Sequence, residues 1–155
     1  MSVFTTPDDQ PVYRLLNSDA RMLATEQQTE GELTVVESTG NRGHSTPRHR
    51  HLRATETFIL LAGEMIIEVG DERREAAAGH VAILPRGIPH SFVVVSPSVR
   101  YLTVHTPGGF DRFVRDLSIA SAGTGPADAA TLAAVAAQHG IEMLGPGLPL
   151  PRHGE

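Results

Sequence analysis

The chain contains no cysteine and no tryptophan. Without cysteine it can form no disulfide, iron–sulfur cluster or thiolate zinc site, and it has no thiol nucleophile. No apolar run approaches the roughly 20 residues that a membrane-spanning helix needs. The first residues also lack the basic start and apolar centre of a signal peptide. We therefore expect a cytoplasmic protein with no membrane partner.

Positive charge and aromatic side chains are scarce. The chain has 13 Lys and Arg residues against 18 Asp and Glu, which gives a formal net charge of −5, and its aromatic residues are five Phe and two Tyr. Proteins that bind nucleic acid need a cationic surface, and those that bind single strands need aromatic stacking platforms. This composition argues against a nucleic-acid partner.

Short β-strands are predicted over most of the chain. A length of 155 residues fits one domain with its own hydrophobic core. Branched and aromatic runs between turn residues predict strands at 12–16, 22–25, 33–37, 57–61, 64–69, 73–76, 81–84, 91–95 and 100–105. Many short strands at this spacing indicate a sandwich or barrel. The strands on either side of Gly63 are expected to form a hairpin with a tight turn.

Helical spacing replaces the strand pattern near residue 107. Apolar side chains at i, i+3, i+4 and i+7 predict one helix face: Phe110, Phe113, Val114 and Leu117. An alanine-rich stretch at 128–139 predicts a second helix, and the tail beyond it is expected to be extended or disordered. The expected organisation is an N-terminal arm (1–11), a barrel (12–106), and a C-terminal helical segment and tail (107–155).

Two blocks of sequence hold residues with metal-ligand chemistry. The first carries His49 and His51, with Glu56 five residues further on, and the second ends in His90. Side chains at i and i+2 of a strand share a face, so the two neighbouring imidazoles can converge on one point. A turn near residue 53 would return the Glu56 carboxylate to that point. His90 would arrive from a later strand.

Three imidazoles and one carboxylate suit one divalent transition metal, which could be Ni, Fe, Mn, Co, Cu or Zn. Such a set leaves two positions of an octahedral shell open, and open positions usually mark chemistry rather than structure. A pair of histidines spaced by one residue is also common on protein surfaces. The added glutamate, the framing glycines and the second block favour the metal site over that interpretation.

This pattern resembles the two motifs of the cupin superfamily of small β-barrels. All fixed positions of the first motif, G(X)5HXH(X)3,4E(X)6G, are present as Gly43, His49, His51, Glu56 and Gly63. The second, G(X)5PXG(X)2H(X)3N, is matched by Gly79, Pro85, Gly87 and His90, with Val94 in place of the final Asn. The resemblance implies an all-β cupin barrel (a double-stranded β-helix or jelly roll) with short C-terminal helices, and a homodimer.

A second resemblance suggests the chemistry. Residues 106–118 and 139–146 resemble actinobacterial single-domain cupins that are grouped with quercetin 2,3-dioxygenase. This implies a metal-dependent dioxygenase that acts on a flavonol or a related aromatic or polyketide enol, with dioxygen as co-substrate. It also implies that His49, His51, Glu56 and His90 hold the metal. Glu56 would then be both a ligand and the catalytic base.

Two other functions stay open at this point. One is a metal-dependent polyketide cyclase or isomerase that uses no oxygen. The other is a non-enzymatic cupin that binds a small molecule. Among the remaining histidines, His44 and His80 are expected to face solvent, and His105 is expected to support the site or the fold without binding the metal. The helix near residue 110 should pack on the barrel or cover its mouth as a lid.

Overall fold

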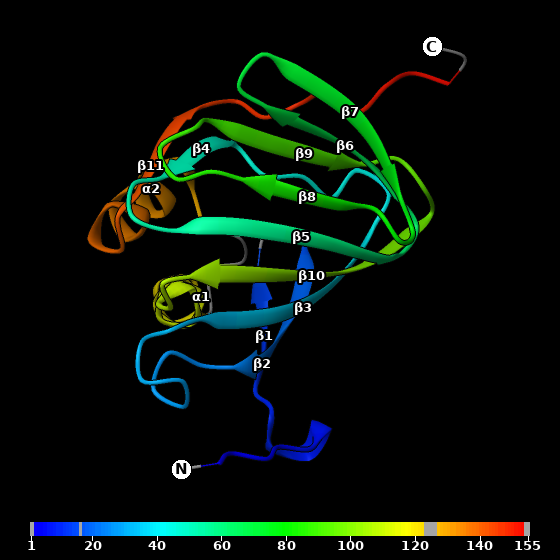
Figure 1. Cartoon of the computed structure of the whole chain (residues 1–155). Coiled ribbons are helices and arrows are strands. Elements are labelled where there is room, and N and C mark those ends of the chain that lie inside the picture. Colours follow the sequence, from blue (N-terminus) through cyan, green and yellow to red (C-terminus); the bar gives the residue numbers. More distant parts are fainter. Residues whose placement is uncertain (1, 16, 123–126, 154–155) are drawn as a thin grey trace.

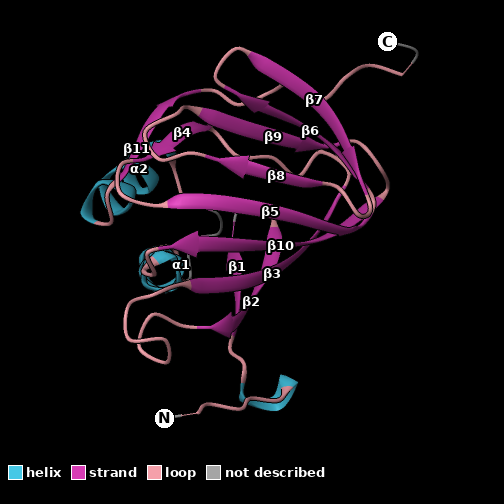
Figure 2. Ribbon diagram, in the orientation of Figure 1, coloured by secondary structure: helices cyan, strands magenta, loops and turns pink. Residues whose placement is uncertain are grey.

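Two antiparallel β-sheets face each other, with two helices at one end (Figures 1 and 2). The computed structural model describes residues 2–15, 17–122 and 127–153. The six-stranded sheet has the order β1 (Val12–Leu15), β2 (Ser18–Ala24), β3 (Thr34–Asn41), β10 (Ser98–Thr106), β5 (Thr55–Ala62) and β8 (Val81–Leu84). The five-stranded sheet has the order β11 (Ile141–Gly145), β4 (Arg48–His51), β9 (His90–Val94), β6 (Glu64–Val69) and β7 (Glu72–Ala77). This architecture confirms the predicted all-β barrel.

The strands follow the local sequence signals closely. β6 and β8 have the predicted bounds, and the turn between β6 and β7 falls at residues 70–71, as predicted. Every residue of β9 is buried, which explains why its apolar run does not alternate with polar residues. In β10, by contrast, buried positions alternate with more exposed ones, so only one face of that strand points into the core.

The predicted hairpin around Gly63 is wrong. β5 pairs with β10 and β8, whereas β6 pairs with β7 and β9 in the other sheet. The chain does turn sharply at Gly63, where φ is +88° and an added Cβ would lie 2.3 Å from the Ser98 carbonyl oxygen. Gly63 is therefore a turn, as predicted, but this turn carries the chain from one sheet to the other.

Two hydrophobic clusters hold the fold together. One fills the space between the sheets with large side chains such as Phe58, Leu60, Met65, Phe92 and Tyr101. Burial of each such side chain contributes about 1.5–3 kcal/mol. This cluster is the barrel core, and it supports the strands that carry the candidate site.

The second cluster attaches the helices to the barrel. Helix α1 (Phe110–Ala120) buries Phe113, Val114 and Leu117, and helix α2 (Ala129–Gln138) packs beside it in the same cluster. This confirms the apolar face predicted from the helical spacing. Asp128 caps α2, since its side chain accepts a hydrogen bond from the Thr131 amide at 2.7 Å. Among the described residues, neither helix is long and apolar enough to cross a membrane.

Strand β11 was not predicted. After α2 the chain reverses at Gly140, where φ is +69°, and residues 141–145 pair with β4. The Arg50 guanidinium lies 3.0 Å from the Glu142 carboxylate across this pair. The beginning of the tail is therefore part of a sheet beside the strand that carries His49 and His51. The final residues, 154–155, lie outside the described part of the chain.

Candidate metal centre

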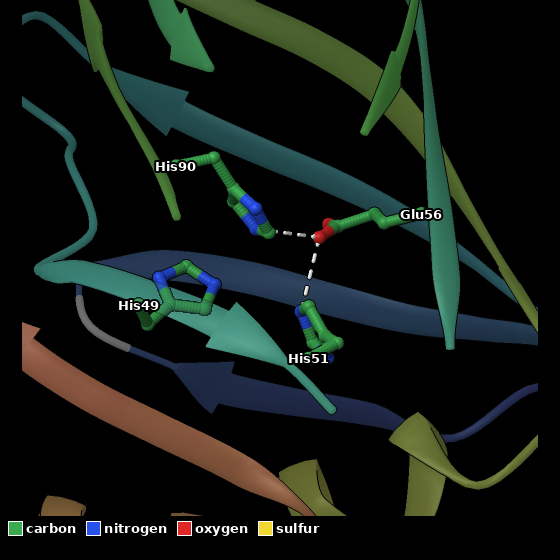
Figure 3. Close-up of side chains that lie close together, drawn as sticks. All are labelled: His49, His51, Glu56 and His90. Carbon is green, nitrogen blue, oxygen red and sulfur yellow. Dashed lines mark ion pairs between the residues drawn. The ribbon is translucent and has the colours of Figure 1, made fainter. Parts of the chain in front are cut away.

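Three strands bring the four predicted ligands together. His49 and His51 lie on the buried face of β4, Glu56 lies on β5, and His90 begins β9 directly opposite His49. Their ligand atoms all lie within 4.8 Å of one another, and all four side chains are buried. Figure 3 shows Glu56 pointing between His51 and His90, with His49 beside them. The structure thus gathers the complete set that the two motifs proposed.

The facing atoms of this cluster lack hydrogen-bond partners. Glu56 Oε2 lies 3.1 Å from His51 Nε2 and 3.1 Å from His90 Nε2. Within the described residues, all three atoms are buried without a hydrogen bond. Burying such an atom without a hydrogen bond costs about 1–3 kcal/mol of stability. Buried polar atoms without partners are therefore rare in folded proteins, and those that occur often have a functional role. A divalent cation held by these atoms would satisfy all of them, so the residues fit a metal.

Backbone carbonyls fix the orientation of two imidazoles. His49 Nδ1 donates to the Pro47 carbonyl oxygen at 2.7 Å, and His90 Nδ1 donates to the Ile88 carbonyl oxygen at 3.1 Å. A carbonyl can only accept, so in each neutral ring the Nε2 lone pair is left free for a metal. In both cases the partner is two residues earlier in the chain.

Burial and neighbouring charges set the protonation of the cluster. Burial, with the nearby imidazoles of His90 and His51, lowers the pKa of His49 to about 3. Burial by itself raises the pKa of Glu56, but the surrounding imidazoles, His105 foremost, hold it well below its usual range. At neutral pH the site therefore combines a neutral His49 imidazole with an ionised carboxylate. This is the state that metal binding requires.

His105 lies next to the ligands without belonging to their set. It is 1% exposed, and its Nε2 is 3.4 Å from Glu56 Oε1. Neither ring nitrogen has a hydrogen-bond partner among the residues that the structure describes, and the Phe110 ring stacks on the imidazole with a centroid distance of 4.0 Å. Burial lowers the pKa of His105, against the effect of Glu56. The sequence predicted His105 at the end of a strand, and in the fold its imidazole lies against the Glu56 carboxylate.

The expectation for His44 is wrong, and that for His80 is confirmed. His44 is 4% exposed, and its Nε2 lies 3.0 Å from the Tyr101 hydroxyl. The segment before β4 folds onto β9, because the Val94 amide donates to the His44 carbonyl oxygen at 2.8 Å. This long-range contact has no signal in the local sequence. His80 is exposed in the turn before β8.

A pocket of about 350 Å³ adjoins the cluster at the helical end of the barrel. His51 and His105 line it from the barrel, Phe110 lines it from α1, and His139 lines it from the end of α2. Of the four candidate ligands, His51 lines this pocket. The sequence could not reveal it, because its walls come from segments more than 80 residues apart.

Comparison with known proteins agrees with this geometry. The cupin domain family matches residues 30–105. Quercetin 2,3-dioxygenase of Bacillus subtilis (strain 168) is 32% identical over 106 residues, which are 67% of this chain and 32% of that protein. The chain therefore spans about a third of the length of this relative.

Solved structures share the fold at lower identity. KdgF from Halomonas sp. superposes with a TM-score of 0.63 at 19% identity, over 71% of this chain and 99% of that one. The polyketide cyclase RemF from Streptomyces resistomycificus gives a TM-score of 0.58 at 24% identity, over 68% and 80% of the two chains. Identities this low establish the common barrel and carry no information on the reaction.

Proposed function

The chain belongs to the cupin family and resembles quercetin 2,3-dioxygenase, and from this premise we propose that it is a metal-dependent dioxygenase. Its substrate would be a flavonol or a related aromatic or polyketide enol. The observation that carries the proposal is the buried meeting point of His51 Nε2, Glu56 Oε2 and His90 Nε2, none of which has a hydrogen-bond partner in the described part of the chain. The sequence match to the dioxygenase supports the choice of reaction.

His49, His51, Glu56 and His90 would hold the metal, and the donor set suits Ni, Fe, Mn, Co, Cu or Zn. The metal would supply Lewis-acid chemistry that lowers the pKa of an enol hydroxyl. The carbonyls of Pro47 and Ile88 hold the rings of His49 and His90 in place, so the Nε2 lone pairs of these two imidazoles point in fixed directions.

Glu56 would also accept the enol proton. Its Oε2 faces the two ligand imidazoles, while its Oε1 lies 3.4 Å from His105 Nε2. One oxygen can therefore serve the metal while the other takes the proton. The free Nε2 of His105 can accept a hydrogen bond from the protonated carboxyl.

Dioxygen uptake tests the proposed reaction. Protein loaded with each candidate metal is mixed with quercetin, and dioxygen consumption, quercetin loss and carbon monoxide release are followed together. The proposal predicts equal loss of dioxygen and quercetin, and at least about 100-fold slower turnover in Glu56→Gln. The matched control is Glu75→Gln, on the exposed face of β7, which should keep the wild-type rate. Consumption of an enol without dioxygen would refute the dioxygenase and favour a cyclase or isomerase.

We also infer a homodimer, which the cupin resemblance implies. Edge strand β8 leaves Val81 and Ile83 exposed at 58% and 65%, and exposed apolar side chains on a sheet edge favour pairing with another chain. Sedimentation at several protein concentrations tests this. A Val81→Arg, Ile83→Arg variant should sediment as a monomer. A wild-type protein that is monomeric at all concentrations would contradict the inference.

A further inference from the structure

The pocket beside the candidate metal centre has walls that the cupin match does not supply. The match ends at residue 105, whereas Phe110, Arg112 and residues 138–141 all line the pocket. The same pocket reaches His51 and His105 at the edge of the ligand cluster. Part of the pocket's shape and charge therefore comes from residues outside the cupin match, and these residues can indicate which substrate this chain binds.

One arginine that lines the pocket has no acidic partner among the described residues. Arg112 pairs with Glu26, with Nε and Oε2 2.5 Å apart, and both residues line the pocket. His139 is held by Asp116 at 2.8 Å. Arg53, whose side chain is exposed at the rim, also lines the pocket, and within the described part of the chain it has neither a hydrogen bond nor an ion pair. The pocket therefore favours a ligand with negative charge.

The start of α1 adds to this preference. The helix begins at Phe110 and its N-cap is Gly109, which has no side chain to cap the first amides. A helix N-terminus carries a partial positive charge that stabilises anions. Asp111, in the same turn, is directed elsewhere, because its Oδ1 accepts hydrogen bonds from Thr34 Oγ1 at 2.8 Å and from the Glu26 amide at 3.3 Å. Asp111 does not line this pocket.

The inner end of the pocket is aromatic and polar. Phe110 stacks on His105 at a centroid distance of 4.0 Å and meets His51 edge-on at 5.9 Å. His105 is buried with two unpartnered ring nitrogens. An aromatic side chain beside free polar atoms suits a planar ligand that bears a hydroxyl or enol oxygen.

We infer that this pocket selects a planar aromatic or enolic substrate that carries a carboxylate, with the carboxylate on Arg53 and the reacting oxygen directed to Glu56. The inference rests on the proposed function and narrows its substrate class, because an unsubstituted flavonol carries no carboxylate. Phe110 supplies the aromatic wall between the two ends of the ligand. Arg53 is in this account a specificity residue and does not touch the reacting atoms.

Two probes that differ by one carboxylate test the inference. 6-Hydroxy-2-naphthoate and 2-naphthol share a ring system and a hydroxyl, and their fluorescence reports binding to the full-length, metal-loaded protein. The wild type should bind the naphthoate about fivefold more tightly, the scale of one partly exposed ion pair. Arg53→Ala should abolish this preference, and Arg53→Lys should keep part of it. The control is Arg73→Ala on β7, an exposed arginine outside the pocket, which should bind like the wild type.

Phe110→Ala locates the site independently of charge, because it should weaken both probes by a similar factor. A preference for the naphthoate that survives Arg53→Ala would overturn the inference, and so would failure of both probes to bind at millimolar concentration. The result is separable from the proposed reaction. An Arg53-dependent preference without dioxygen uptake would refute only the dioxygenase. Dioxygen uptake with quercetin and no Arg53-dependent preference would refute only the carboxylate.

Discussion

Metal binding at the four-residue cluster should raise the stability of the fold, and Glu56→Gln should reduce that gain. Three buried atoms of the cluster lack hydrogen-bond partners among the described residues, namely His51 Nε2, Glu56 Oε2 and His90 Nε2. A metal present at about 1,000 times its Kd stabilises the native state by about 4 kcal/mol. For a chain of this size, each kcal/mol raises Tm by about 2–4 °C. The wild type should therefore gain about 8–16 °C.

Glu56→Gln keeps the shape of the side chain and removes the anionic ligand. The affinity for the metal should fall by at least about 10–100-fold, which is the typical loss when a residue that only supports a ligand is removed. This fall corresponds to about 1.4–2.7 kcal/mol of binding free energy. The metal-induced gain should then be about 3–11 °C smaller. Calorimetry with metal and with chelator measures the gain within each variant, so a change in baseline stability does not matter. Glu75→Gln should keep the full gain. An equal gain in Glu56→Gln would refute the assigned ligand set.

Three further predictions concern the barrel and its helices. Phe113→Ala should lower the free energy of unfolding, measured in urea, by about 3–5 kcal/mol, because Phe113 is buried in the cluster between the helices and the sheet. The control is Ile119→Ala in the same helix: Ile119 is 67% exposed, so the free energy of unfolding should change by less than about 0.5 kcal/mol. Similar costs for the two would contradict the packing. Tyr101→Phe should cost about 1–2 kcal/mol, since it removes the hydroxyl 3.0 Å from His44 Nε2, and an unchanged urea midpoint would count against that contact. In metal-free protein, the lowered pKa of Glu56 means that its ionised form stabilises the fold above pH 4.5, and that this contribution is lost as the pH falls through the folded-state pKa. The stability contributed by Glu56, measured against Glu56→Gln, should therefore shrink on acidification below pH 4.5, and a contribution that grows there would contradict the assignment.

The meeting of the four candidate ligands could be predicted from sequence because local geometry places most of them. His49 and His51 share a face of one strand, so their spacing alone brings the two rings together. His90 needed the second motif, and its register opposite His49 became visible only in the folded sheet. The charge on Glu56 likewise depends on His105, which lies 49 positions later in the chain.

The errors concern how distant segments pair. A glycine between two apolar runs reads as a hairpin, but strand pairing depends on which neighbours each strand finds across the barrel. β5 and β6 therefore separate into different sheets at Gly63. β11 forms at a sheet edge against β4, a partner that lies far earlier in the chain. His44 has a polar local context and is buried only because its segment folds onto β9. Each missed feature is a tertiary contact.

Elemental analysis of the purified protein tests the central claim most directly. The account predicts about one divalent transition metal ion per chain in the wild type and almost none in a His49→Ala, His51→Ala variant. A variant with His80→Ala and His153→Ala loses the same number of imidazoles outside the cluster, and it should keep the metal. Equal metal content in the wild type and the His49→Ala, His51→Ala variant would show that the metal is not bound where the four side chains converge.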